Sequence, residues 1–370
     1  MKSAKFYDIH CHAINMSHPC LLAFARRCLK SLKEISFSAM KGAFKNIASS
    51  RIYNEVLNMT FSMRETQNLL SAMENDAGSL FLLQENCLLG NYGFKPPLIQ
   101  NNVMTVAGAK YSGMVLTPLI MDFGYQASEI PGIYYNKPAE KPVNEQIADL
   151  LNGIKKYCEK SEVNFFEIYP FIGINTKNYT ANKISEILNK YFGEYEGKYS
   201  DLKSNMGKFN GDIKNTGSNF FAGIKLYPPL GFDPWPKNDI DELKKLELLY
   251  SYCCEKNIPV TTHCDDEGFL VCDENEALAY TSPERFEGAL KNFPELKLNI
   301  AHFGRRTGRP ISEWTSKICD LMLRYKKVYT DFSFNGAIDG YYEHLGNFIN
   351  TANIELKERI YKKLLFGTDF

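Results

Sequence analysis

The chain has 370 residues, of which 44% are hydrophobic and 23% charged, and its 43 basic and 43 acidic residues give a formal net charge of zero. This balance leaves no field of one sign to attract nucleic acid or an anionic membrane. No stretch approaches the ~18 apolar residues of a membrane span, and the N-terminus lacks the apolar core of a signal peptide. The ten cysteines lack C-x-x-C spacing, which favours free thiols. We therefore expect a cytoplasmic protein with a small-molecule substrate, acting alone or as a homo-oligomer.

Short apolar stretches alternate with helical patterns along the chain. Apolar residues recur at helical intervals between residues 19 and 75, and further helical patterns cover 78–90, 144–159, 181–192, 239–256, 311–325 and 341–363. Another helix is expected to begin at Ser282-Pro283, because proline is favoured at the first helical position. Eight stretches have the length and apolar content of buried strands: 5–13, 111–119, 165–173, 220–227, 258–263, 296–302, 328–332 and 364–369.

This alternation predicts an α/β fold with parallel strands and helices outside them, and eight such units close into a TIM-type (β/α)8 barrel. An open doubly wound sheet is disfavoured because no Gly-x-Gly-x-x-Gly follows any of the strands. Long insertions are expected after the first strand and after the third, where residues 193–217 are rich in Gly, Lys, Asn and Ser. We expect one domain over residues 1–370.

The predicted eighth strand is followed directly by Phe370, so the sequence contains no eighth helix. In a barrel of this type that helix covers the last strand against the first. We expect that the chain is truncated at its C-terminus, or that an upstream segment or a partner subunit covers the gap.

Four of the six histidines lie where predicted strands end. Two of them, His10 and His12, are two residues apart on the first strand, so their side chains point to the same face. Active-site residues of TIM barrels gather at the C-terminal ends of the strands. The candidate residues that share this edge are His10, His12, Lys225, His263, His302 and Asp369.

The strand-end motifs together resemble those of the amidohydrolase superfamily, and most closely its amidohydrolase-related, or amidohydrolase-2, branch. The resemblance extends from the first strand to the eighth and implies a metal-dependent hydrolase on a TIM barrel. It is carried by Asp8-Ile9-His10-Cys11-His12, Gly223-Ile224-Lys225-Leu226-Tyr227-Pro228, Thr262-His263-Cys264, Ala301-His302-Phe303-Gly304 and Phe366-Gly367-Thr368-Asp369.

A divalent cation, most simply one or two Zn²⁺ ions, would give these residues their roles. Zinc binds imidazole nitrogen and carboxylate oxygen, and it makes water a nucleophile near neutral pH. Asp369 can accept the proton of that water and pass it to a leaving group. The expected metal ligands are His10, His12, His263, Asp369 and Lys225.

Two residues have roles that rest on the resemblance. It implies that His302 binds a second metal ion or polarises the substrate carbonyl. Lys225 resembles the lysine that carries CO₂ as a carbamate and bridges two metals in binuclear members. An unmodified Lys225 would instead hold an anionic group of the substrate, or extend away from the site.

Four residues are candidates for substrate binding. Arg305 and Arg306 follow the sixth strand, and their guanidinium groups suit a carboxylate or phosphate, although surface arginines are common. Tyr227 and Trp235 flank the exit of the fourth strand, where they can line a pocket or pack in the core.

Other polar residues near the strand ends are expected to have minor roles. Asp331 ends the seventh strand and can orient the substrate or a ligand histidine. Asp265 and Asp266 are expected to be solvated loop carboxylates, and His18 and His344 lie outside the pattern.

These residues predict a metal-dependent hydrolase that cleaves a C–N or C–O bond of a small, anionic carbonyl substrate such as an amide, lactone or ester. One alternative is a lyase that decarboxylates or hydrates a small carboxylated substrate. Another is a metal-binding barrel without catalytic activity.

Overall fold

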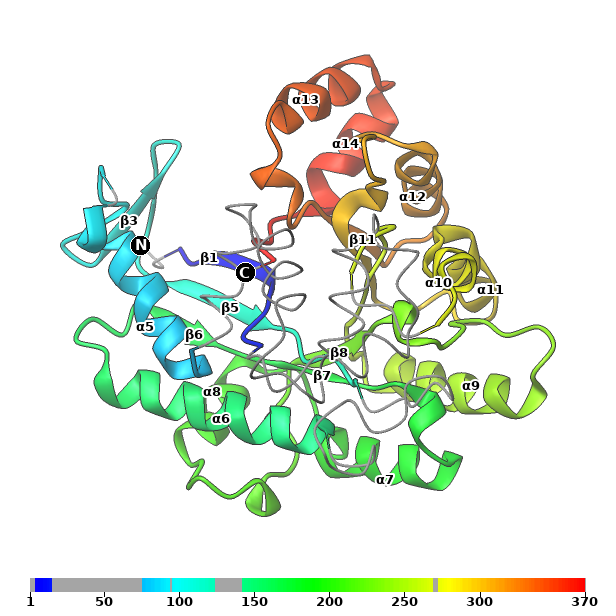
Figure 1. Cartoon of the computed structure of the whole chain (residues 1–370), viewed down its shortest axis with the longest axis horizontal. Coiled ribbons are helices and arrows are strands. Elements are labelled where there is room, and N and C mark those ends of the chain that lie inside the picture. Colours follow the sequence, from blue (N-terminus) through cyan, green and yellow to red (C-terminus); the bar gives the residue numbers. More distant parts are fainter. Residues whose placement is uncertain (1–3, 15–74, 94, 124–141, 269–271, 370) are drawn as a thin grey trace, which may run out of the picture.

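The computed structural model describes residues 4–14, 75–93, 95–123, 142–268 and 272–369 (Figure 1). The helical pattern predicted between residues 19 and 75, and His18 with it, falls outside the described residues apart from residue 75. Among the helices that the structure describes, none combines the length and the apolar character needed to cross a membrane.

Parallel strands form the centre of the molecule in two groups. One sheet has the order β1-β5-β6 and the other the order β12-β11-β10-β9-β8-β7. Most of these strand residues are buried, as expected for parallel strands covered on both faces. The strands are β1 (Phe6–Cys11), β5 (Met114–Pro118), β6 (Phe166–Ile168), β7 (Phe171–Gly173), β8 (Gly223–Leu226), β9 (Val260–Thr262), β10 (Leu298–Ile300), β11 (Val328–Asp331) and β12 (Leu364–Leu365).

The predicted third strand is divided between the two sheets. It breaks at Tyr169-Pro170 into β6, which pairs with β5, and β7, which pairs with β8. Proline has no N–H to give to a ladder, so the pairing is interrupted there. The eight predicted strands therefore appear in the neighbour order of a TIM barrel, with the third one broken in its middle.

The first and last strands meet through single hydrogen bonds. Among the described residues no ladder joins β12 to β1, so the paired strands do not make a complete ring. The Ile9 amide donates to the Phe366 carbonyl at 3.0 Å, and the Asp369 amide donates to the His10 carbonyl at 2.8 Å. Gly367 permits this approach, because a Cβ there would lie 2.6 Å from the Cβ of His10.

Helices lie around the outside of the strands, from α5 and α6 through α9 and α11 to α14 (Figure 1). The helix predicted over 239–256 is α9, and the Asp239 side chain caps it by accepting from the amide of Glu242. The α-helices are α5 (Ala77–Leu88), α6 (Pro142–Lys160), α7 (Ala181–Phe192), α8 (Tyr199–Gly207), α9 (Ile240–Glu255), α10 (Glu274–Thr281), α11 (Pro283–Asn292), α12 (Glu313–Arg324), α13 (Tyr341–Thr351) and α14 (Ile354–Lys363). Short 3₁₀ turns are η2 (Asn91–Gly93), η3 (Thr176–Asn178), η4 (Ile213–Asn215), η5 (Pro228–Leu230), η6 (Ala301–Gly304) and η7 (Asn335–Ala337).

Three elements differ from the sequence prediction. The helix expected over 341–363 is two helices, because Asn353 caps a new one by accepting from the Leu356 amide. Part of the unassigned stretch 193–217 forms α8. A small antiparallel sheet of β2 (Ile99–Gln100), β3 (Val103–Val106) and β4 (Ala109–Tyr111) was not predicted. Its tight turns have positive φ at Asn101-Asn102 and Ala107-Gly108, the geometry that two-residue hairpins favour.

Candidate metal centre

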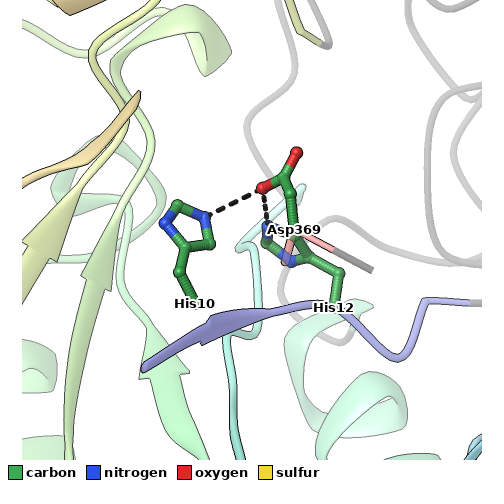
Figure 2. Close-up of side chains that lie close together, drawn as sticks. All are labelled: His10, His12 and Asp369. Atoms are coloured by element: carbon green, nitrogen blue, oxygen red, sulfur yellow. Dashed lines mark ion pairs between the residues drawn. The ribbon is translucent and has the colours of Figure 1, made fainter. Parts of the chain in front are cut away.

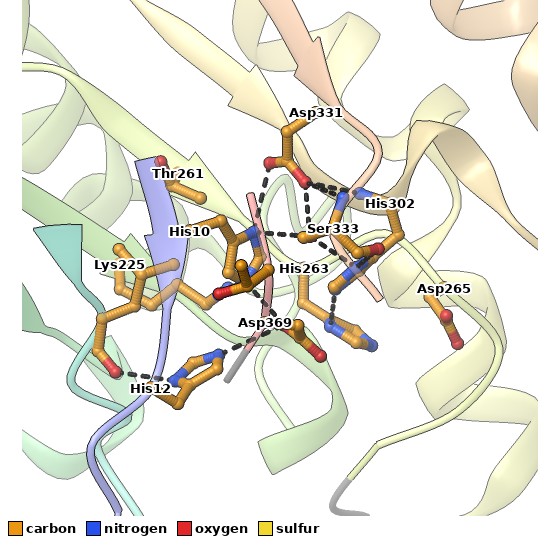
Figure 3. Close-up of polar contacts among 12 residues, drawn as sticks. His10, His12, Lys225, Thr261, His263, Asp265, His302, Asp331, Ser333 and Asp369 are labelled. Atoms are coloured by element: carbon orange, nitrogen blue, oxygen red, sulfur yellow. Dashed lines mark hydrogen bonds and ion pairs between the residues drawn. The ribbon is translucent and has the colours of Figure 1, made fainter. Parts of the chain in front are cut away.

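The strand-end residues converge on one buried cluster. Figure 3 shows side chains from β1, β8, β11 and the segments after β9, β10 and β12 meeting at one end of the strands. The structure thus brings together the six residues predicted to share this edge. Lys225 is 1% exposed and His10 is fully buried, so this chemistry is largely screened from water.

His10, His12 and Asp369 form the first candidate metal-binding group (Figure 2). One carboxylate oxygen, Asp369 Oδ1, lies 3.1 Å from His10 Nε2 and 3.6 Å from His12 Nε2. His10 lies on β1 and His12 directly follows it, and both reach this oxygen, as their spacing predicted. Two imidazole nitrogens and a carboxylate oxygen are ligands typical of Zn²⁺.

The hydrogen bonds of these two imidazoles fix which nitrogen carries a proton. His12 Nδ1 lies 2.9 Å from the carbonyl oxygen of Leu119, and His10 Nδ1 lies 3.1 Å from Asp331 Oδ2. Carbonyl and carboxylate oxygens only accept, so both Nδ1 atoms donate, and each Nε2 atom carries a lone pair whenever its ring is neutral. These lone pairs face the Asp369 carboxylate, an arrangement of acceptors that a cation would stabilise.

His263 and His302 repeat this arrangement beside the first pair. His263 Nε2 lies 2.8 Å from the Glu267 carbonyl, and His302 Nδ1 lies 3.1 Å from the carbonyl of Ser333. The remaining nitrogens, His263 Nδ1 and His302 Nε2, face one another at 3.0 Å. Burial, together with the neighbouring positive charges, lowers the pKa of His263 well below its ordinary value, so its ring is neutral at pH 7. The second pair therefore also directs lone pairs inward.

Asp331 orients the site rather than binding a cation. Its Oδ2 accepts from His10 Nδ1 and from Asn299 Nδ2 at 2.6 Å, and its Oδ1 accepts from the Ser333 hydroxyl and from the amides of Ser333 and His302. Although burial alone would raise the pKa of Asp331, His10 and His302 hold it well below the usual range. With both oxygens already accepting, the group of His10, His302 and Asp331 is a poor metal site despite its short distances.

Two residues of the site have left-handed backbone conformations. His302 has φ 60° and Asp369 has φ 73°, values that cost free energy for residues other than glycine. Asn335 Nδ2 donates to the His302 carbonyl at 2.7 Å and so holds the first of these turns. Such strain persists only where the surrounding contacts enforce it, which is common at functional sites.

Lys225 projects into the cluster from β8. Its Nζ lies 3.3 Å from His10 Nε2 and 5.7 Å from the centre of the Tyr227 ring, which packs against His263. Burial lowers the pKa of Lys225 to about 8, against the opposing attraction of Asp369 and Asp331. The structure places Lys225 and Tyr227 at the cluster; their roles as metal ligand and pocket wall stay predictions.

The predicted substrate-binding arginines are held by carboxylates. Arg305 pairs with Asp265 at 2.6 Å and with Glu267 at 2.9 Å, and Arg306 pairs with Glu313 at 2.5 Å. The expectation that Asp265 is solvated is wrong, because it is 4% exposed beneath Arg305. These ion pairs do not favour substrate contact by Arg305, whose role stays a prediction.

The other two residues predicted to contact the substrate, Arg306 and Trp235, differ in their surroundings. Arg306 lines a cavity of about 160 Å³ together with Pro229 and Glu274, so substrate contact by Arg306 stays a prediction. Trp235 packs against Tyr250 and Phe293, which favours the core-packing alternative.

Sequence reasoning missed two residues that support the cluster. Asp8, in the first motif, is 1% exposed, and burial raises the pKa of its carboxyl group to about 7. The Ser333 hydroxyl lies about 3 Å from ring nitrogens of both His10 and His302. Each lies two residues from a residue already considered, His10 or Asp331, and this alternation along an extended chain was the available signal.

Comparison with known proteins shows a similarity over part of the chain. Residues 213–370 match the sequence profile described as "Amidohydrolase". The match covers less than half of the 370 residues, so this segment of the chain is similar to amidohydrolases. The match covers Lys225, His263, His302 and Asp369.

Comparisons with curated proteins and solved structures add less. A search of curated proteins gave no match. A dihydroorotase from Campylobacter jejuni is 18% identical, with 70% of this chain and 62% of that chain covered and a TM-score of 0.33. A probable 2-pyrone-4,6-dicarboxylic acid hydrolase from Acinetobacter baumannii is 16% identical, with 70% and 68% covered and a TM-score of 0.36. The chain thus spans less than two thirds of the dihydroorotase.

Proposed function

We propose that this protein is an amidohydrolase that cleaves a C–N or C–O bond in a small carbonyl compound, such as an amide, lactone or ester, with the help of a divalent cation. The observation that carries the proposal is the approach of His10 Nε2 and His12 Nε2 to one oxygen of Asp369. The facing nitrogens of His263 and His302 belong to the same cluster. His10, His12 and Asp369 would hold the cation, with His263 as a further ligand. Zn²⁺ is the simplest candidate because nitrogen and oxygen ligands suit it.

Each residue of the site would have its own role in this reaction. When bound, the cation would polarise a carbonyl group and make water acidic. Asp369 would take the proton from the attacking water and deliver it to the leaving nitrogen or oxygen. His302, in its neutral form, would orient the substrate carbonyl. Asp331 would keep His10 and His302 in place through the hydrogen bonds that it accepts.

The substrate is proposed to be a small molecule, and an anionic group on it would be bound by Lys225. Arg305 and Arg306 give little support to an anionic substrate, because carboxylates of the protein already pair with both guanidinium groups. The zero net charge and the lack of a candidate membrane span among the described residues are compatible with the proposed cytoplasmic location. A homo-oligomer stays a prediction.

The proposal predicts chelator-sensitive hydrolysis. A panel of small amides, lactones and esters is incubated with the protein as purified, after dialysis against a chelator, and after Zn²⁺ is restored. We expect at least one compound to be hydrolysed, with loss on chelation and recovery with Zn²⁺. CO₂ release from carboxylated members of the panel would instead identify a lyase. A protein that binds Zn²⁺ and turns over no compound of either kind would support the non-catalytic alternative.

Replacement of Lys225 distinguishes its two proposed states. A carbamate would form as CO₂ adds to the neutral amine with loss of a proton, and Lys225→Ala would then lose activity that a small carboxylic acid plus metal partly restores. An unmodified amine that holds the substrate would give Lys225→Ala a raised KM with metal content near that of the wild type. Metal content and kinetics are measured beside Lys244→Ala, an exposed lysine on α9. Loss of metal in Lys225→Ala would contradict the amine.

A further inference from the structure

Asp8 is a buried carboxylate that the proposed chemistry does not use. It is 1% exposed, and it accepts hydrogen bonds from the His10 amide at 3.2 Å, the Thr368 amide at 3.1 Å and the Thr368 hydroxyl at 2.7 Å. Burial of a carboxylate is costly unless hydrogen bonds compensate it, and an apolar side chain would fill the same space at lower cost. Its contacts connect the first strand to the residue that precedes Asp369.

The segment that carries Asp369 depends on contacts of this kind. The ladder between β11 and β12 ends at Leu365, and the chain continues to Asp369 through separate hydrogen bonds. Asp369 itself has the left-handed φ of 73°, which its neighbours must enforce. The Asp369 amide is bonded to the His10 carbonyl, and Thr368 is bonded to Asp8, so the first strand holds both residues.

We propose that Asp8 and Thr368 form an interstrand clamp that positions Asp369 over His10 and His12. One carboxylate fixes the backbone of His10 and that of Thr368, and thereby sets the 3.1 Å approach of Asp369 Oδ1 to His10 Nε2. Asp8 is a positioning residue, since it acts through Thr368 and Asp369. The inference rests on the proposed function only in assigning Asp369 to a metal centre.

Thr368→Val removes the hydroxyl that donates to Asp8 and keeps the shape of the side chain, whereas Thr368→Ser keeps the hydroxyl. The probe is Co²⁺, titrated into the metal-free full-length protein and followed by its visible absorption, which reports coordination geometry. We expect Thr368→Val to bind Co²⁺ ~10-fold more weakly or worse, with an altered spectrum, as is usual when a group that orients a ligand is lost. Thr368→Ser should match the wild type.

A double-mutant cycle separates positioning from general stability. If the clamp acts through Asp369, adding Thr368→Val to Asp369→Ala should cause little further loss of Co²⁺ affinity. Thermal unfolding is recorded for each variant, and Asp8→Asn replaces Thr368→Val if the latter does not fold. Wild-type Co²⁺ affinity and spectrum in Thr368→Val, with or without a lower Tm, would overturn the clamp. A wild-type protein that binds Co²⁺ but hydrolyses nothing would overturn the proposed function alone, and one that binds no Co²⁺ would overturn both.

Discussion

Replacing His10 and His12 together by alanine is expected to strip the protein of its divalent cation and to abolish chelator-sensitive turnover. Both rings direct Nε2 toward the same oxygen of Asp369, and each has its Nδ1 committed to a fixed acceptor. Loss of both would leave Asp369 without the two nitrogens nearest to its Oδ1. The remaining histidines of the site, His263 after β9 and His302 after β10, face each other at 3.0 Å.

The measurement is metal content by elemental analysis, together with kcat at saturating Zn²⁺. His344→Ala is the matched control, since His344 is exposed on α13 and should keep wild-type metal content and turnover. Full metal occupancy in the double variant would show that the cation, if present, is held elsewhere.

The edge at which this site lies was predictable because the rule behind it is local. His10 and His12 share a face through the two-residue period of a strand, and parallel strands bring their C-terminal ends to one side. His263, His302, Lys225 and Asp369 could therefore be assigned to one edge without knowledge of any distance. The amidohydrolase match over residues 213–370 spans these four residues.

What could not be predicted depends on partners far apart in the sequence. From the sequence, Asp265 is expected to be a solvated loop residue, because its partner Arg305 lies 40 positions later in the chain. The bond between Asp8 and Thr368 spans nearly the whole chain and requires the register of the first strand against the last. Side-chain pairing of this kind follows from tertiary packing, on which sequence periodicity carries no information.

The sequence contains a signal for the break in the third strand. Pro170 lies inside the stretch 165–173, and a proline within a strand argues against continuous pairing. The turns of the small antiparallel sheet were also visible as Asn101-Asn102 and Ala107-Gly108 between short apolar runs. Both features lie outside the metal centre, so missing them did not alter the candidate residues.

Replacing Asp369 by asparagine is expected to separate metal binding from turnover. Asparagine keeps the shape of the side chain and one carbonyl oxygen, but it cannot accept a proton at the working pH. The histidines of the site remain to hold the cation, so we expect Asp369→Asn to keep substantial metal content. Turnover should fall by ~10² or more, as for other positioned acid–base groups.

The position of Asp369 makes this separation measurable. Its Oδ1 lies within 3.1 Å of His10 Nε2, close enough to share a proton or a ligand position with the first pair of histidines. Metal content and kcat at saturating Zn²⁺ are compared with those of Asp339→Asn, an exposed aspartate between η7 and α13. Loss of metal with loss of turnover would make Asp369 chiefly a ligand. Wild-type turnover in Asp369→Asn would remove Asp369 from the mechanism, and another group that faces the cluster would then have to accept the proton. Lys225 is the first candidate, because its Nζ lies 3.3 Å from His10 Nε2 and burial lowers its pKa to about 8.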